Sequence, residues 1–415
     1  MPGVGIDDFG ADFIKYLPGV TYTMRRTSPM RNMPLRDIKW EGTKLVKKLH
    51  TAYNTAIADI EDGGGLPPAK KQDFTETEVT RRFTAGSVQV TDGALANAKT
   101  TKGAAIRVVS SELKGLLEGM RKREGFMLCR DGTGVVALMG STVSGATFTV
   151  DDARALWPKG DYEIRDATTT STVHANFTVT SVARGYSSGA ATVTPSATLA
   201  ASGQAQNDLV VWNTGDYSSY GRAVTGLDAL IDDTLSTSFQ GTDVSAIPWW
   251  TSPVFNGGGA TQLLSSTLLR QVLATLKQES EDFDDVPGGL MVCTEVWSAI
   301  QFEELFEHAV RVSPKDSAVG IKGGVTFQTA FGTITVKAYP DIIYGNMLFI
   351  NRKAIARPVQ KKLDWRPGGT AGIFDRSDRF AAFTATALEI HDLMVLERNT
   401  CAKITNLQVS PQTAY

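Results

Sequence analysis

Cysteine is scarce in this chain, with three residues in 415, and Cys129, Cys293 and Cys401 form no CxxC pair. Their wide separation argues against a disulfide framework and against a thiolate zinc site. Histidine is almost as scarce, with four residues, and none lies beside a serine or cysteine in a nucleophile motif. We therefore expect no nucleophilic active site, and a reducing cytoplasm suits the three thiols.

Neither sign of charge is in excess, because 42 lysines and arginines face 44 aspartates and glutamates. Proteins that bind by neutralising phosphates carry a strong positive field, so tight nucleic-acid binding is not expected. Long apolar runs are also missing: no stretch reaches the ~18 residues of a membrane span. The N-terminus carries acids and a proline where a signal peptide needs basic residues and an apolar core. We expect a protein made and kept in solution, with no membrane partner.

The first part of the chain predicts an arm, a helix and a hairpin. Its length and apolar content of 42% suffice for about two to three domains. Prolines in residues 1–40 deny a long helix and predict an extended arm lying on a neighbouring subunit; the alternative is a terminus without fixed contacts. Residues 41–60 have apolar side chains at helical spacing and predict a helix. Residues 61–91 alternate polar and β-branched residues and predict a protruding β-hairpin.

The strongest single element is the helix predicted at 102–130, which has an apolar stripe opposite a charged face and ends at the glycine-rich turn 131–134. Residues 141–213 are rich in Thr, Ser, Ala, Gly and Val and predict a small all-β insertion. Residues 222–380 predict an α/β domain with helices at 263–278 and 294–306 and strands at 325–331, 333–339 and 347–350. Residues 381–415 predict long strands that return to the long helix.

Three short motifs suggest chemistry, but each has a structural interpretation that we favour. GTGVVA at 132–137 matches the dinucleotide pattern GxGxxA, yet a helix precedes it where a strand is needed. The acidic run 279–285 lacks the glycine and final glutamate of a calcium loop. Glu304 and His308 are one helical turn apart, with no third ligand evident nearby. We predict no enzyme, no cofactor and no metal site.

The order and spacing of longer segments resemble the tailed-bacteriophage major capsid protein family, which has the Hong Kong 97 fold. The similar segments cover nearly the whole chain and are, in order, RRFTAGSVQVTDGALANAKTTKGAAIRVVSSELKGLLEGMRKREGFMLCRDGTGVVA, TGLDALIDD with FQGTDVSAIPWW, FGTITVKAYPDIIYGNMLFINRKAI and LEIHDLMVLERNTCAKITNL. Each motif is degenerate by itself, so the specificity of the resemblance comes from their order.

This resemblance implies an α+β capsid fold with an inserted small all-β domain. Residues 1–40 would be the N-terminal arm, 41–60 a helix leading to the extended loop, and 61–91 that loop as a β-hairpin. Residues 92–140 would be the peripheral domain with its spine helix, and 141–213 the β-rich insertion. Residues 222–380 would form the axial domain, and 381–415 the C-terminal strands of the peripheral domain.

The resemblance also implies a function: hexamers and pentamers of the chain would form the icosahedral head that encloses a double-stranded DNA genome, assembled in the bacterial host cytoplasm. The implied partners are further copies of the chain, a separate scaffolding protein, a portal protein, decoration proteins and packaged DNA contacted non-specifically. An encapsulin-type shell of the same fold is the alternative. Candidate assembly contacts are the charged and aromatic residues of the arm and loop: Arg25, Arg26, Lys70, Lys71, Phe74, Glu76, Glu78, Arg81 and Arg82.

Overall fold

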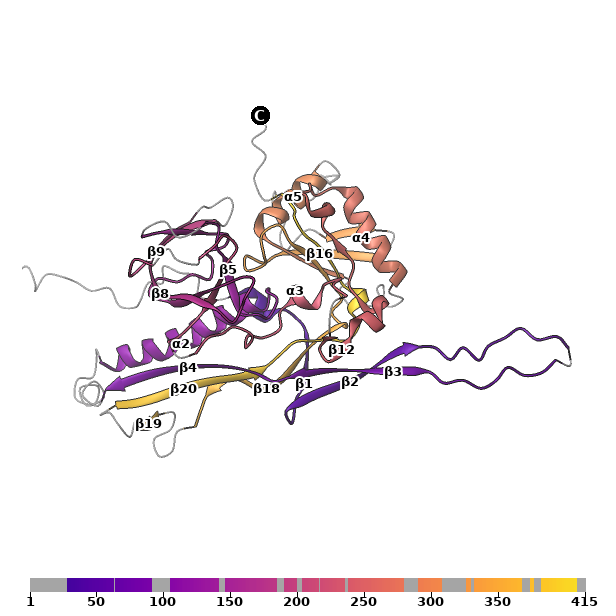
Figure 1. The fold of residues 1–415 in the computed structure, drawn as a ribbon, viewed down its shortest axis with the longest axis horizontal. Helices are drawn as coiled ribbons and strands as arrows, with labels where there is room; N and C mark the ends of the chain where they lie inside the picture. The colour runs from indigo at the N-terminus through magenta and orange to yellow at the C-terminus, as the bar shows by residue number, and fades with distance from the viewer. Residues whose placement is uncertain are drawn as a thin grey trace, which may run out of the picture.

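The computed structural model describes residues 28–62, 64–91, 105–141, 146–184, 190–199, 204–215, 217–235, 238–279, 290–307, 326–329, 332–367, 374–376 and 382–408. A long sheet runs along one side of the molecule, two further sheets lie above it, and a two-stranded hairpin projects from one end (Figure 1). Few helices accompany many strands. The expected α+β class is thus confirmed.

The long sheet has six strands and joins segments from both ends of the described chain. Its central strands β18 (Ile355–Trp365) and β20 (Ala382–His391) are antiparallel. β20 also pairs along its whole length with β4 (Arg82–Thr91), and over a shorter stretch with β19 (Phe374–Arg376). β18 pairs in parallel with β1 (Arg36–Lys39) and antiparallel with β21 (Met394–Val395).

Helix α2 (Ala105–Met127) lies along β4 and β20 and is the long helix predicted at 102–130 (Figure 1). Gly86 of β4 permits its close approach, because a Cβ there would come within 2.9 Å of Met120 Sδ. Gly132 and Gly134 follow the helix with φ of 86° and 89°, a backbone conformation that side chains disfavour. The glycine turn therefore ends the helix, as predicted.

A second six-stranded sheet carries the α/β region. Its order is β13 (Val254–Phe255), β22 (Ala402–Ile404), β17 (Met347–Ile350), β14 (Leu290–Thr294), β16 (Gly332–Ala338) and β15 (Thr326–Thr329). Helices α4 (Ser266–Glu279) and α5 (Val296–Glu307) lie on it. Leu273 and Phe302 of these helices share a buried core with Phe349 of the sheet. Both predicted helices and the three predicted strands are present.

The predicted all-β insertion is a third sheet, in the order β5 (Val135–Leu138), β10 (Leu209–Trp212), β7 (Asp161–Arg165), β8 (Val173–Arg184), β9 (Ala191–Pro195) and β6 (Phe148–Val150). A bridge between Met139 and Val150 connects its two outer strands. The sheet thereby closes on itself as a small barrel. Tyr162 and Phe177 fill its interior, with ring centroids 5.8 Å apart.

The helix predicted at 41–60 is wrong. Residues Lys44–Ala52 form strand β2, which pairs antiparallel with β3 (Asp73–Thr80). Lys44 Nζ lies 2.7 Å from Glu78 Oε1, and Lys48 lies directly opposite Glu76. The spacing of the apolar residues fits either structure, and cross-strand pairing with a partner far along the chain selects the strand. The hairpin is therefore formed by residues 44–80 and not by 61–91, because β4 belongs to the long sheet.

Other predicted boundaries also need correction, because pairing between distant segments overrides their order along the chain. β18 lies in the predicted 222–380 unit but is a central strand of the long sheet. β22 lies in the predicted 381–415 unit but belongs to the α/β sheet. Within the predicted arm, residues 28–40 pack on the chain's own core, with Met30 and Met33 buried. Residues 1–27 lie outside the described residues.

Short elements surround the core between the long sheet and the α/β region. They are α3 (Leu227–Leu230), the strand pair β11 (Ser238–Phe239) and β12 (Thr242–Asp243), and the 3-10 helices η2 (Pro29–Asn32), η3 (Val244–Ala246), η4 (Pro248–Trp250) and η6 (Arg398–Thr400). A further 3-10 helix, η5 (Gly257–Gly259), follows β13 and buries no residue. Met30, Leu230 and Cys401 meet in this core. Within the described residues, we find no helix with the length and apolarity needed to cross a membrane.

Candidate functional site

The hairpin of β2 and β3 is fixed to the body of the molecule at its base. The backbone N–H of Glu78 donates to Gln240 O at 2.6 Å, and Thr242 Oγ1 donates to Glu76 O at 3.1 Å. Trp40 and Val79 are buried with Met394 in a small core beneath these contacts. The hairpin therefore leaves the body in a defined direction (Figure 1).

Beyond the paired strands, the tip segment (residues 53–62 and 64–72) exposes large apolar side chains. Tyr53, Ile57 and Leu66 are 81%, 86% and 85% exposed, and Phe74 at the end of β3 is 58% exposed. Burying one such side chain typically stabilises a structure by about 1.5–3 kcal/mol, so exposing several of them on one projection is costly. Apolar residues gathered on a projecting element are typical of an interaction surface.

The structure places most of the candidate contact residues on or beside this hairpin. Lys70 and Lys71 are in the tip segment, where Lys70 Nζ donates to Thr55 Oγ1 at 3.1 Å. Phe74 stacks edge-on against His50, with ring centroids 5.4 Å apart. Glu76 is exposed on β3, whereas Glu78 is half-buried near the base.

Two further candidates lie where the hairpin joins the long sheet. Arg81 covers the ring of Phe83, with its Cζ 5.2 Å from the ring centroid. Arg82 Nη1 donates to Gly221 O at 2.8 Å, which gives it a role within the subunit. Arg25 and Arg26 lie outside the described residues. An assembly role for any of the candidates remains a prediction.

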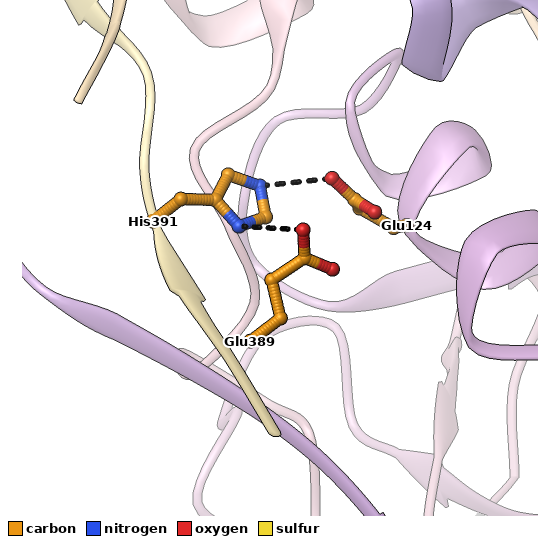
Figure 2. Close-up of side chains that lie close together, drawn as sticks. All are labelled: Glu124, Glu389 and His391. Carbon is orange, nitrogen blue, oxygen red and sulfur yellow. Dashed lines mark ion pairs between the residues drawn. The ribbon is translucent and has the colours of Figure 1, made fainter. Parts of the chain in front are cut away.

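A second feature is a buried set of charged side chains, the junction cluster (Arg31, Glu124, Glu389 and His391). Figure 2 shows Glu124 of α2 reaching toward His391, while Glu389 approaches the imidazole from the same strand, β20. His391 Nε2 lies 3.1 Å from Glu124 Oε1, and His391 Nδ1 lies 3.9 Å from Glu389 Oε1. Arg31 of η2 bridges the two carboxylates at 2.8 and 2.6 Å. The cluster thus joins η2, α2 and β20.

Burial and mutual charge shift the titration of these groups. Burial, followed by repulsion from Glu124, raises the pKa of Glu389 to about 7. Burial alone would lower the pKa of His391, but the neighbouring Glu124 and Glu389 outweigh it, so the pKa is raised. Burial likewise opposes ionisation of Glu124, but contact with His391 and Arg31 lowers its pKa. The geometry and these directions favour an ionised Glu124 and a proton held on His391 or on Glu389.

Glu124, Glu389 and His391 are also the one group in the described residues whose ligand atoms, all within 4.8 Å, could surround a metal ion. Arg31 already bridges both carboxylates, and a guanidinium beside them repels a cation. We therefore interpret the cluster as an ion-pair network.

The three cysteines are buried and unbonded to one another. Burial raises the pKa of each thiol, to about 12 for Cys401. Thiols held in the protonated state are poor nucleophiles.

The sequence interpretation missed the junction cluster, although two signals for it exist. Glu124 lies four residues after Met120 and so continues the apolar stripe of the long helix. Glu389 and His391 continue the buried face of β20, two and four residues beyond Ala387. Charged residues in positions that should face a core indicate a buried polar network, or a functional site.

Comparison with solved structures identifies the fold. The capsid asymmetric unit of cyanophage A-1(L) is similar over 97% of this chain and 98% of its own, with a TM-score of 0.59 and 12% identity. The capsid of a native GTA particle is similar over 98% of this chain and 100% of its own, with a TM-score of 0.52 and 7% identity. No protein-family model and no curated protein matches the sequence. The chain therefore has the fold of tailed-phage major capsid proteins.

Proposed function

We propose that this chain is the major capsid protein of a tailed phage, a shell subunit that assembles into the head around the DNA genome. The observation that carries this proposal is the projecting hairpin, whose apolar tip is exposed among the residues that the structure describes. The capsid-protein fold supports the same conclusion, because it covers nearly the whole chain. The subunit then works by contact with other copies and not by catalysis.

The exposed tip has the energetic properties of a repeated contact between subunits. If a neighbouring copy buries the side chains of Tyr53, Ile57, Leu66 and Phe74, each contributes about 1.5–3 kcal/mol, or roughly 6–12 kcal/mol per subunit before ordering costs. Every subunit donates one hairpin and receives another, which is a heterologous contact that closes into rings. Contacts of moderate strength then add up over the whole shell.

The near balance of charge suits a shell around DNA. The 42 basic and 44 acidic residues provide no strong field that would hold the genome tightly. We infer hexamers and pentamers in an icosahedral shell, with a separate scaffolding protein, a portal protein and decoration proteins as further partners. In this proposal residues 1–27 act as the arm, the hairpin as the extended loop, and the long sheet with α2 as the peripheral domain.

Replacing the hairpin tip tests the proposal. Ala52 and Asp73 are register partners, so Asn-Gly in place of residues 53–72 makes a two-residue hairpin turn and leaves β2 and β3 intact. We expect the variant to match the unaltered subunit in circular dichroism and melting temperature, but to form no closed shells under electron microscopy. Both chains are expressed with and without the neighbouring phage genes, so that a missing scaffold is not mistaken for a failed contact.

A matched pair of double variants separates apolar contact from general disturbance of the tip. Ile57→Asp with Leu66→Asp should prevent shells, whereas Asp59→Asn with Glu61→Gln should not. Closed shells from the Asp variant would contradict the proposed contact. The content of purified shells then distinguishes the two shell functions: DNA supports a phage head, and protein cargo without DNA supports an encapsulin-type compartment.

A further inference from the structure

The junction cluster is placed where three segments of the chain meet. Its members come from η2, from the last turn of α2 and from the end of β20. Glu124, Glu389 and His391 are 3%, 6% and 1% exposed. Gly125, beside Glu124, brings η2 so close that a Cβ there would overlap the Ser28 side chain. A change of charge in the cluster therefore changes the strength of the contact between η2, α2 and β20.

The charges balance when the cluster holds one proton, on His391 or on Glu389. Arg31 and that proton then offset the two carboxyl groups. When His391 and Glu389 are both deprotonated, two carboxylates share one guanidinium, and a net negative charge remains inside the protein. A buried charge without a partner is strongly destabilising. Opening the junction to water relieves that cost.

Protons can reach the cluster without unfolding. His391 and Glu389 form part of the wall of a cavity of about 360 Å³, which Arg31 and Ser28 also line. The cavity lies between η2, β1, α2, β18 and β20. A cavity of this size holds several water molecules, and the imidazole can exchange its proton with them.

Charged groups face His391 from every element around it. Besides the cluster itself, they are Arg121 on α2, Arg82 on β4, Asp37 on β1, Arg357 and Lys362 on β18, and the adjacent Asp392 on β20. Arg357 pairs with Asp37 at 2.8 Å. Asp392 accepts from the backbone N–H groups of Thr225 and Leu393 at 2.7 and 2.9 Å. These acids have partners of their own, so the charge balance depends on His391 and Glu389.

We propose that the junction cluster is a pH-sensitive contact that holds residues 28–39 and α2 on β20 while His391 or Glu389 carries a proton, and loosens when both have lost it. The contact belongs to the subunit itself, so it does not rest on the proposed function. It makes the junction tight in mildly acidic and neutral solution and weak in alkaline solution.

The direction follows from proton linkage. In the unfolded chain the pKa values of Glu389 and His391 are near 4.5 and 6.5, and folding raises both. The folded state therefore binds more protons across this interval. The stability that these groups contribute is fully present below the unfolded pKa values and is lost as the pH rises through the folded ones, about 7 for Glu389 and above 6.5 for His391.

Hydrogen–deuterium exchange of the full-length subunit between pH 6 and pH 9 tests the proposal. Exchange times are scaled for the tenfold increase in intrinsic rate per pH unit. We expect opening of residues 33–39 and 120–127 to increase at least tenfold across this range, the effect of a pKa shift of about one unit. The buried strand β14 is the internal control and should show no such increase. Equal behaviour of the junction and β14 would overturn the proposal.

Two variants should shift the pH dependence in opposite directions. Glu389→Gln removes one buried negative charge, so the junction should stay closed up to pH 9. His391→Gln removes one of the two groups that can hold the proton, so the junction should open at a lower pH than in the unaltered chain. His174→Gln is the matched control, because His174 lies 3.6–3.7 Å from two carboxylates in the barrel, away from the junction. If His391→Gln keeps the unaltered profile, the proposal is wrong.

A nuclear magnetic resonance titration of the unaltered protein, with labelled histidine, gives an independent measurement in case a variant fails to fold. The proposal requires the His391 imidazole to titrate above 6.5. A titration below that value would overturn it.

Discussion

Two glycines of helix α2 should respond to alanine in opposite ways. In a helix interior, alanine is more favourable than glycine by about 1 kcal/mol. Gly115 has no atom within 4 Å of the position its Cβ would take, so Gly115→Ala should gain about that amount. At Gly125 the added methyl group would overlap the Cβ and Oγ of Ser28, which is 3% exposed. Substitution by alanine should therefore stabilise the protein at Gly115 and destabilise it at Gly125.

The expected loss at Gly125 has two parts. Overpacking a dense core costs about 1–3 kcal/mol. Moving Ser28 also breaks the buried hydrogen bond that its hydroxyl donates to Asp341, a bond to a charged group worth about 1.5–3 kcal/mol. After subtraction of the helix gain of about 1 kcal/mol, Gly125→Ala should lose about 1.5–5 kcal/mol.

Urea unfolding of the isolated subunit, followed by circular dichroism, measures both changes. A second substitution, Ser28→Gly, removes the overlapping atoms. In the Gly125→Ala background it should therefore cost less than in the unaltered chain, and the double-mutant cycle gives the coupling. If Gly125→Ala is as stable as Gly115→Ala, close contact between η2 and α2 does not hold the N-terminal segment in place, and the reasoning fails.

Three further substitutions test separate parts of the fold. Tyr162→Phe removes a barrel hydroxyl that donates to Ala155 O at 2.9 Å and accepts from Trp157 N at 2.8 Å, so thermal melting should show a loss of about 1–3 kcal/mol. Trp40→Ala empties the core beneath the hairpin, and should cost about 3–5 kcal/mol in urea unfolding while hydrogen exchange of β2 and β3 increases. Arg398→Ala removes a buried guanidinium that donates to two carbonyls of α3 at 2.9 and 3.1 Å, and urea unfolding should show a loss of at least about 1.5 kcal/mol.

Local patterns in the sequence predicted the elements whose structure depends on nearby residues. The long helix is an example, because its apolar stripe and terminal glycine turn lie within one segment. The barrel is another, since its short alternating runs and turns are local signals. The capsid-type fold was predicted from the order of such segments, and the structural similarity confirms it.

Features that depend on contacts between distant parts of the chain could not be predicted from local sequence patterns. Leu45, Val46 and Leu49 fit a helix or a strand equally well, and only pairing with β3, about thirty residues later, selects the strand. The junction cluster likewise needs Arg31, Glu124 and His391 to meet across more than 350 residues of chain. A single sequence shows which residues are charged, but not which of them lie close together in the folded protein.

The treatment of strand edges connects the fold to its proposed use. The barrel joins its outer strands through Met139 and Val150, which closes the sheet on itself and protects its edges. The hairpin does the opposite: among the described strands, β2 pairs with β3 alone, and a two-stranded ribbon is marginally stable in water by itself. An unprotected ribbon with an apolar tip is a liability in a protein that works as a monomer. It becomes an advantage when a second copy covers the ribbon, because the same contact then stabilises the hairpin and joins the subunits.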